Sequence, residues 1–190
     1  MGLGQRYEAM KIHSNNLKSI AADQGVAVDQ LAAAVERVGL KGDDAAKAVR
    51  NWMAGRDHPR CKPADMRMLA QTLGVPVKDI ARFTSEVRFH RGSPLKARLV
   101  ADMIRGKQVA EALEMLTFST KRAATNIQKA LAAAYAEAEQ NDVDDSRLYI
   151  TESRVDEGPP IKRFQPKDRG RAHPILKRTS HITVTIEERN

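Results

Sequence analysis

Two short runs of alternating apolar and polar residues constrain the fold of this chain more than any other feature. They occupy residues 148–151 and 182–186, and each places its apolar side chains on one face with the period of two that a β-strand has. The roughly thirty residues between them hold few apolar side chains, without regular alternation, and cannot form a second core. If the two runs pair, the intervening chain is a long hairpin whose arms reach about 30 Å, at about 3.3 Å per residue.

The intervening segment is also strongly basic. Residues 158–181 contain seven Lys or Arg and one Asp, a net charge of +6, whereas the whole chain has a formal charge of +8. An isolated two-stranded ribbon is marginal in water and its cations repel one another, so the ribbon is predicted to need a polyanionic partner. Gly158-Pro159-Pro160 and Gly170 interrupt a regular ladder, which suits the irregular surface of a folded RNA. Composition alone leaves a solvated, partly disordered loop as the alternative.

The rest of residues 85–190 predicts helices that cover one face of a small sheet. A strand is predicted at 86–91, and helices are predicted at 94–104, 109–116 and 121–140. Ser93 stands where it can cap the first of these helices, with a proline after it. The fold class is therefore α+β: three helices packed on a small antiparallel sheet, with a long protruding β-hairpin at about residues 156–181.

Residues 1–84 are predicted to form a small all-α domain. The expected helices cover 17–23, 29–38, 43–53, 63–73 and about 76–83, and glycines follow the first four. In the second helix, Leu31, Ala34, Val35 and Val38 are predicted to share one buried face. A linker is expected at Thr84-Ser85.

Composition excludes several classes of protein. The pI of about 9.8 favours nucleic acid or another anionic partner. A single cysteine, Cys61, rules out an intrachain disulfide and zinc sites built on paired cysteines. Neither a membrane span nor a signal peptide is apparent, so a soluble, cytoplasmic protein is expected. Aromatic residues make up only 4% of the chain, so backbone electrostatics must carry most of any nucleic-acid binding.

A series of short motifs in residues 86–188 resembles the L22 family of large-subunit ribosomal proteins. The motifs are Ser93-Pro94-Leu95-Lys96-Ala97-Arg98, Ile104-Arg105-Gly106-Lys107, Val155-Asp156-Glu157-Gly158-Pro159, Lys162-Arg163-Phe164, Gly170-Arg171-Ala172 and Lys177-Arg178-Thr179-Ser180-His181. The resemblance implies a non-enzymatic constituent of the large subunit that binds ribosomal RNA and supports assembly. It also implies a hairpin that lines the peptide exit tunnel beside ribosomal protein four and the nascent peptide in transit.

The resemblance assigns roles to individual residues. Those it implies as contacts to ribosomal RNA are Ser93, Lys96, Arg98, Arg105, Lys107, Lys162, Arg163, Lys167, Arg169, Arg171, Lys177, Arg178, Thr179, Ser180 and His181. Those it implies as the tunnel-lining hairpin tip are Lys162, Arg163, Phe164, Gly170, Arg171 and Ala172. The sequence departs from the family pattern at Asp168 and at His173-Pro174, which bears on the geometry of the tip.

Residues 14–83 resemble helix-turn-helix domains of the lambda-repressor or Cro type, on the motifs Val49-Arg50-Asn51-Trp52, Leu73-Gly74-Val75 and Asp79-Ile80. In that fold the helix that ends at Trp52 would enter the major groove of DNA. Its start carries acids and alanines, which repel phosphates and read no base edge. Docking on ribosomal RNA or a neighbouring ribosomal protein through Lys47, Arg50, Arg56 and Arg60 is the preferred interpretation. A DNA-binding regulator with an RNA-binding second domain is the alternative.

No catalytic residues, metal or cofactor are predicted. Asp57, His58 and Cys61 lie close together in the sequence but lack a fourth ligand. The acids at 152, 156 and 157 are not expected to form a catalytic pair, because adjacent strand residues point to opposite faces. They are expected either to limit nonspecific contacts with RNA or to pair with arginines of the ribbon.

Overall fold

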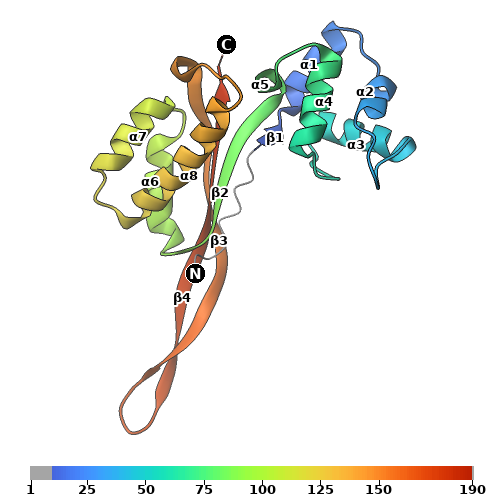
Figure 1. The fold of residues 1–190 in the computed structure, drawn as a ribbon. Helices are drawn as coiled ribbons and strands as arrows, with labels where there is room; N and C mark the ends of the chain where they lie inside the picture. The colour runs from blue at the N-terminus through green and yellow to red at the C-terminus, as the bar shows by residue number, and fades with distance from the viewer. Residues whose placement is uncertain (1–9, 190) are drawn as a thin grey trace. The chain divides into compact units, whose positions relative to one another are not determined.

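The computed structural model describes residues 10–189, which form two compact units. The N-terminal unit comprises residues 10–83 with 140–143, and the C-terminal unit comprises 84–139 with the described residues from 144 onward. Strand β2 (Ala81–Arg91) begins in the first unit and continues into the second (Figure 1).

The N-terminal unit is a cluster of helices around a tryptophan. Its elements are β1 (Met10–Ile12), α1 (Ser14–Asp23), α2 (Val28–Ala34), α3 (Asp43–Met53), α4 (Pro63–Leu73), α5 (Val77–Ile80) and the first residues of β2. Trp52 on α3 is fully buried together with Leu17, Leu31 and Leu69, one from each of the three other long helices. Each of the five predicted helices has a counterpart here.

Three details of the N-terminal prediction were wrong. The last helix, predicted at about 76–83, ends at Ile80, and residues 81–83 form a strand. Helix α2 ends at Ala34, and Val38 is 99% exposed instead of lying on the buried face. Paired backbone hydrogen bonds between Arg37 and Leu40 turn the chain sharply there, with Gly39 in the left-handed region that a turn requires. The predicted linker at Thr84-Ser85 lies inside β2, where both side chains are buried.

The errors in the last helix and in the linker have one physical cause. Residues 81–83 pair antiparallel with β1, so the chain leaves α5 directly as a strand. Ala81, Phe83, Ser85 and Val87 are buried at the two-residue spacing of a strand face. This two-residue alternation is present in the sequence. The helical spacing of the residues before it, however, led to the prediction of a helix that continues to residue 83.

The C-terminal unit confirms the predicted α+β class. It contains α6 (Pro94–Ile104), α7 (Val109–Phe118), α8 (Arg122–Glu139), a 3-10 turn η1 (Asp145–Arg147), β3 (Leu148–Pro166) and β4 (Ala172–Glu188). The sheet order is β1-β2-β4-β3, and β3 pairs antiparallel with β4. The three helices lie on one side of the strands in Figure 1.

The core of this unit joins α8 to the two runs that dominate the sequence. Ile127 and Leu131 on α8 are fully buried, as are Ile150 on β3 and its partner Ile186 on β4. Thr84 and Thr185 are buried as well, with their hydroxyl oxygens 3.0 Å apart. A slip of one residue in the strand pairing would move each of these side chains to the opposite face of the sheet. The burial of the apolar side chains and of the two threonines therefore fixes the register.

Beyond this core β3 and β4 continue as a bare hairpin. No residue from 156 to 178 is buried, although the pairing continues to Pro166 and Ala172. The register shifts between Gly158 and Ile161, where the two prolines cannot donate ladder hydrogen bonds. At about 3.3 Å per residue, each arm extends about 35 Å past the core.

Candidate nucleic-acid interface

The end of the hairpin is a five-residue turn, Lys167 to Arg171. The Lys167 amide donates to the Arg171 carbonyl at 2.7 Å, and the Arg171 amide donates to the Asp168 carbonyl at 3.1 Å. Arg169 and Gly170 both have left-handed backbones, with φ of 53° and 70°. An arginine is strained in that region, so the turn holds a cation at its apex at some cost to folding.

Cations lie on both faces of the hairpin. Residues opposite each other in a ladder share a face, and the pairing sets Lys162 opposite Leu176 on one face and Arg163 opposite Ile175 on the other. Phe164 is 77% exposed. Lys162, Arg163 and Phe164 therefore lie on the arm that leads to the turn, while Gly170 and Arg171 lie in the turn and Ala172 begins the returning strand.

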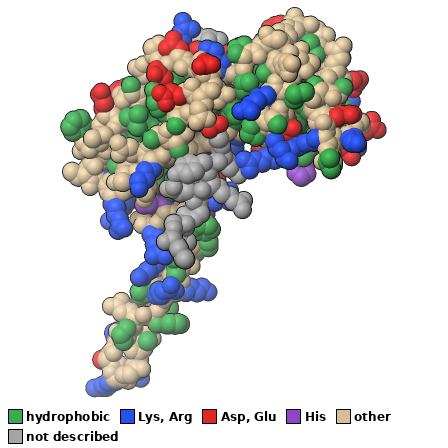
Figure 2. Space-filling model, viewed as in Figure 1, with side chains coloured by type: hydrophobic (Ala, Val, Ile, Leu, Met, Phe, Trp, Pro, Cys, Tyr) green, Lys and Arg blue, Asp and Glu red, His purple; other side chains and the backbone are tan. Residues whose placement is uncertain are grey.

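The hairpin cations lack acidic partners within the described chain. None of the seven forms an ion pair with another residue of 10–189, and all are exposed: Lys162, Arg163, Lys167, Arg169, Arg171, Lys177 and Arg178. Nearer the core, Arg154 contacts Glu152 at 3.4 Å and Asp156 at 3.1 Å. Two of the acids of the ribbon thus pair with its own arginine, as one of the two sequence interpretations proposed. Figure 2 shows Lys and Arg side chains along the shaft and at the end of the hairpin.

The three residues Thr179, Ser180 and His181 form the base of the hairpin. Thr179 is 2% exposed and donates to the Pro159 carbonyl at 2.8 Å, and Ser180 is fully buried. His181 Nδ1 accepts a hydrogen bond from the Phe89 amide at 3.3 Å, and the two rings pack edge-to-face. The structure gives the two hydroxyls internal positions, so they are not part of the exposed basic surface that the sequence assigned to RNA.

Helix α6 braces the same base. Arg98 Nε donates to the Val155 carbonyl at 3.2 Å, and Arg105 donates to the Ser153 carbonyl at 2.6 Å while pairing with Asp102. These two predicted contacts therefore already hold β3 in place. Lys107 is paired with Glu111 one helical turn away.

A basic hollow of about 600 Å³ lies where β2, α6 and α8 meet. Ser93 and Lys96, two of the residues predicted to contact RNA, line it. Arg91, Lys121 and Arg122 add three cations that the sequence interpretation did not name. Arg91 ends a strand and Lys121-Arg122 begins a helix, so their convergence depends on the fold and has no local signal. Ser93 occupies the N-cap position of α6, but its side chain makes no capping hydrogen bond. Four exposed cations around one hollow suit a phosphate group.

His90 forms one wall of this hollow. It is 7% exposed, and its Nδ1 lies 2.6 Å from the amide nitrogen of Asn126. With the Asn126 amide placed in this way, its nitrogen donates and Nδ1 accepts, an arrangement that favours the neutral ring. Burial lowers the pKa of His90, and the nearby Arg122 lowers it further.

In the N-terminal unit the predicted cations are exposed but lie at different ends of α3. Lys47 contacts Asp44 at 3.4 Å near the start of the helix, where Asp43 is also exposed. Arg50 occupies the last turn, and Arg56 and Arg60 follow in the loop to α4. The end of α3 that would read DNA is therefore acidic.

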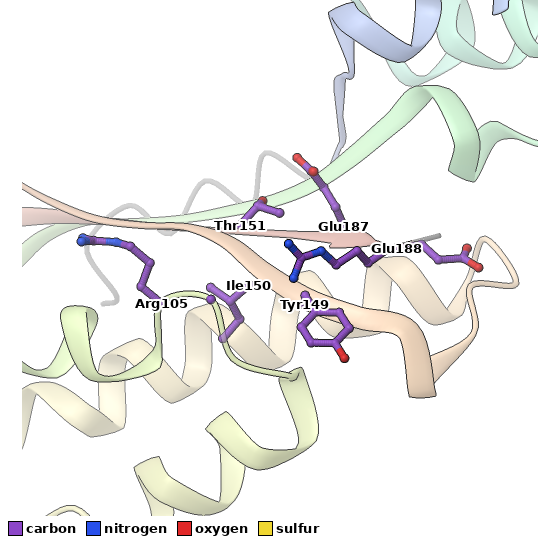
Figure 3. A pocket seen from close by; sticks show the side chains of 8 residues that line it. Arg105, Tyr149, Ile150, Thr151, Glu187 and Glu188 are labelled. Carbon is purple, nitrogen blue, oxygen red and sulfur yellow. The ribbon is translucent and has the colours of Figure 1, made fainter.

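Neither Cys61 nor a second pocket, beside the end of β4, has features of a catalytic site. Burial, together with Asp65 and Asp57, raises the pKa of the Cys61 thiol far above its usual range. Asp57 accepts the Cys61 amide at 2.9 Å, which makes it part of a turn. A second pocket of about 420 Å³ is lined by equal numbers of arginines and glutamates, and the Glu187 and Glu188 side chains point apart (Figure 3).

Within residues 10–189, no cluster of three or more metal-ligating side chains is found. A separate search of the same part of the chain finds no helix with the length and apolar character needed to span a membrane.

Comparison with known proteins gives one consistent result. A model of the family described as ribosomal protein L22p/L17e matches residues 85–187, more than half of the chain. Two curated relatives, both named large ribosomal subunit protein uL22 and both from Lactobacillus delbrueckii subsp. bulgaricus, are 47% identical over 114 residues. These matches cover 60% of this chain and 97% of each relative. The family match leaves out residues 1–84, whose likeness to a helix-turn-helix domain stays a prediction. The chain belongs to the ribosomal protein L22p/L17e family, and it is a structural, non-enzymatic protein of the large subunit of the cytoplasmic ribosome.

Proposed function

We propose that the C-terminal unit binds large-subunit ribosomal RNA and that its hairpin is enclosed by that RNA along the peptide exit tunnel. The observation that carries the proposal is the hairpin from 156 to 178, which has no buried residue and seven exposed cations. A ribbon in contact with a partner on one face would leave the cations of its other face in water. Cations on both faces fit a partner that surrounds it.

The basic hollow supplies a second contact to the same RNA. Its cations come from three elements that the core holds rigidly, so little side-chain and backbone ordering is lost when phosphate enters. The bracing of β3 by Arg98 and Arg105 fixes the direction in which the hairpin leaves the unit. We infer that the hollow and the hairpin act together: one anchors the unit, and the other reaches inward past the site of ribosomal protein four.

The apex of the hairpin is proposed to face the nascent peptide. Gly170, Arg171 and Ala172 lie at the far end of the hairpin, and Asp168 in the same turn moderates their positive charge. A tunnel wall must allow many sequences to pass, and small or mobile polar side chains suit that task. This assignment predicts that the turn contacts a peptide only in translating ribosomes.

Site-directed crosslinking tests the tunnel position. The native Cys61 is buried with a raised thiol pKa, so a cysteine introduced by Ala172→Cys is the main reactive thiol of the chain. In ribosomes stalled with a lysine-containing nascent chain, a short maleimide–amine crosslinker is expected to join this introduced thiol to that chain. A Thr151→Cys variant, whose exposed residue lies beside the core, serves as the control and is expected to give no such product. Equal crosslinking by both variants, or none by either, contradicts the tunnel assignment.

A further inference from the structure

The loop between α3 and α4, residues 54–62, is a basic segment outside the matched family region. It contains Arg56, Arg60 and Lys62 against one acid, Asp57, and Arg50 lies just before it in the last turn of α3. All four cations are exposed. Figure 2 shows Lys and Arg side chains gathered along one edge of the N-terminal unit, with a His side chain beside them.

Hydrogen bonds from the core hold the backbone of this loop. Trp52 Nε1 donates to the Pro59 carbonyl at 2.6 Å, and the Asn51 side chain donates to the His58 carbonyl at 2.8 Å. The Arg56 amide donates to the Asn51 carbonyl at 2.8 Å. Because Trp52 is fully buried, the middle of the loop is fixed to the core of the unit.

The second half of the loop is fixed equally firmly. The Cys61 amide donates to Asp57 and the Lys62 amide to Asp65, both at 2.9 Å. Arg37 bonds the Arg60 carbonyl and pairs with Asp65 at 3.2 Å. Asp57 in the loop, Asp65 on α4 and Arg37 therefore satisfy backbone groups of the loop. The side chains of Arg56 and Lys62 are exposed and form no ion pair with any residue of 10–189. Because the backbone of the loop is already ordered, little conformational entropy is lost when its exposed cations bind a ligand.

The chemistry of this surface favours a phosphate backbone over a protein. The large apolar side chains exposed on the described part of the N-terminal unit are Val38 and Met68, and neither belongs to the loop. Protein interfaces depend on buried aromatic and apolar anchors, whereas phosphate binding depends on exposed Arg and Lys.

The position of the loop also separates it from a DNA-reading site. The acidic start of α3 and its basic last turn lie at opposite ends of an 11-residue helix, which is about 16 Å long at 1.5 Å per residue. A helix-turn-helix domain would present the acidic end to DNA. We propose that the loop 54–62 with Arg50 binds the phosphate backbone of ribosomal RNA, at a place distinct from the contacts of the C-terminal unit and without reading base sequence.

A triple variant of the full chain tests this proposal. Arg50→Gln, Arg56→Gln and Lys62→Gln together remove three cations whose side chains hold no part of the loop. Lys18→Gln, Lys41→Gln and Arg67→Gln remove the same charge from exposed positions elsewhere on the unit and serve as the matched control. Thermal unfolding of both variants is measured first, and both are expected to match the wild type.

The main readout is hydroxyl-radical footprinting of purified large-subunit ribosomal RNA bound by each full-length protein. The wild type and the control are expected to protect two separate RNA segments, and the loop variant is expected to lose one of them. In the same RNA, the loop variant is expected to weaken binding about tenfold and to reduce the slope of log K against log salt by about 2. The loss of a hairpin-dependent segment would instead report on the proposed function of the C-terminal unit.

Three results would overturn the proposal. The first is an unchanged footprint with the loop variant, and the second is equal weakening by the loop and control variants. The third is crosslinking of the loop, within intact large subunits, to another ribosomal protein and not to RNA. A 20-base-pair DNA duplex serves as a further probe: binding that depends on its sequence would also contradict a backbone-only contact.

Discussion

At the scale of single residues, His90 links the core to the basic hollow. Its folded pKa lies below the ordinary value of 6.5, so the unfolded chain binds more protons in the interval between the two values. The free energy of unfolding therefore rises with pH through that interval. The stabilisation that neutral His90 provides is present above about pH 6.5 and is lost as the pH falls toward the folded pKa.

This sign gives a direct prediction for the His90→Gln variant. Glutamine keeps an acceptor for Asn126 but does not titrate. The wild type is expected to lose more thermal stability than the variant between pH 7.5 and pH 5.5, as measured by the Tm of each protein. Parallel Tm curves for the two proteins would show that His90 does not carry this pH dependence.

At the scale of elements, the bulge at the base of the hairpin depends on one glycine. A Cβ on Gly158 would meet Thr179 Oγ1 at 2.6 Å and His181 Nε2 at 3.1 Å. Thr179 cannot turn away freely, because its hydroxyl is buried and bonded to the Pro159 carbonyl. The close approach of β3 to β4 at this point therefore requires the absence of a side chain.

Gly158→Ala is accordingly expected to lower the free energy of unfolding by about 1–3 kcal/mol, the range for overpacking. Urea unfolding checks the value. The double variant with Thr179→Ala is expected to be more stable than the sum of the two single effects predicts, since the clashing oxygen is gone. Simple additivity of the two substitutions would contradict the proposed clash.

The elements that the sequence predicted well are those with strong local signals. Helices α3, α4 and α6 have the predicted bounds, because glycines or prolines mark their ends. The hairpin was predictable from two matching strand patterns joined by a segment without a core. Helix α2 was predicted too long because Val38 continues an apolar period, while the bonds between Arg37 and Leu40 that end the helix have no equally strong signal.

The residues of the candidate site were predictable only where they are close together in the sequence. The hairpin cations are contiguous in the sequence, whereas Arg91 and Lys121-Arg122 meet in the basic hollow only after folding. Motif likeness also could not distinguish exposed residues from buried ones. Thr179 and Ser180 belong to the same run as Lys177 and Arg178, yet the pair nearer the core is buried.

At the scale of the whole molecule, most of the net positive charge lies in the hairpin. The hairpin segment holds +6 of the total +8, so most of the excess lies where no core can form. The folded part of the C-terminal unit is stabilised by ordinary burial around α8 and the sheet. Consequently, substitutions of hairpin cations should separate RNA binding from folding.

Separation of RNA binding from folding is measured by comparing the wild type with a variant that combines Lys162→Gln, Arg163→Gln, Arg169→Gln and Arg171→Gln. A control removes four exposed cations elsewhere, through Lys18→Gln, Lys41→Gln, Arg67→Gln and Lys129→Gln. Thermal unfolding of the free proteins and the salt dependence of their binding to large-subunit ribosomal RNA are both recorded.

The hairpin variant is expected to unfold at the same temperature as the wild type. Its binding to RNA is expected to weaken, with a slope of log K against log salt smaller by about 3, while the control keeps a slope near that of the wild type. A hairpin variant that unfolds, or one that binds RNA with the affinity and salt slope of the wild type, would contradict the account.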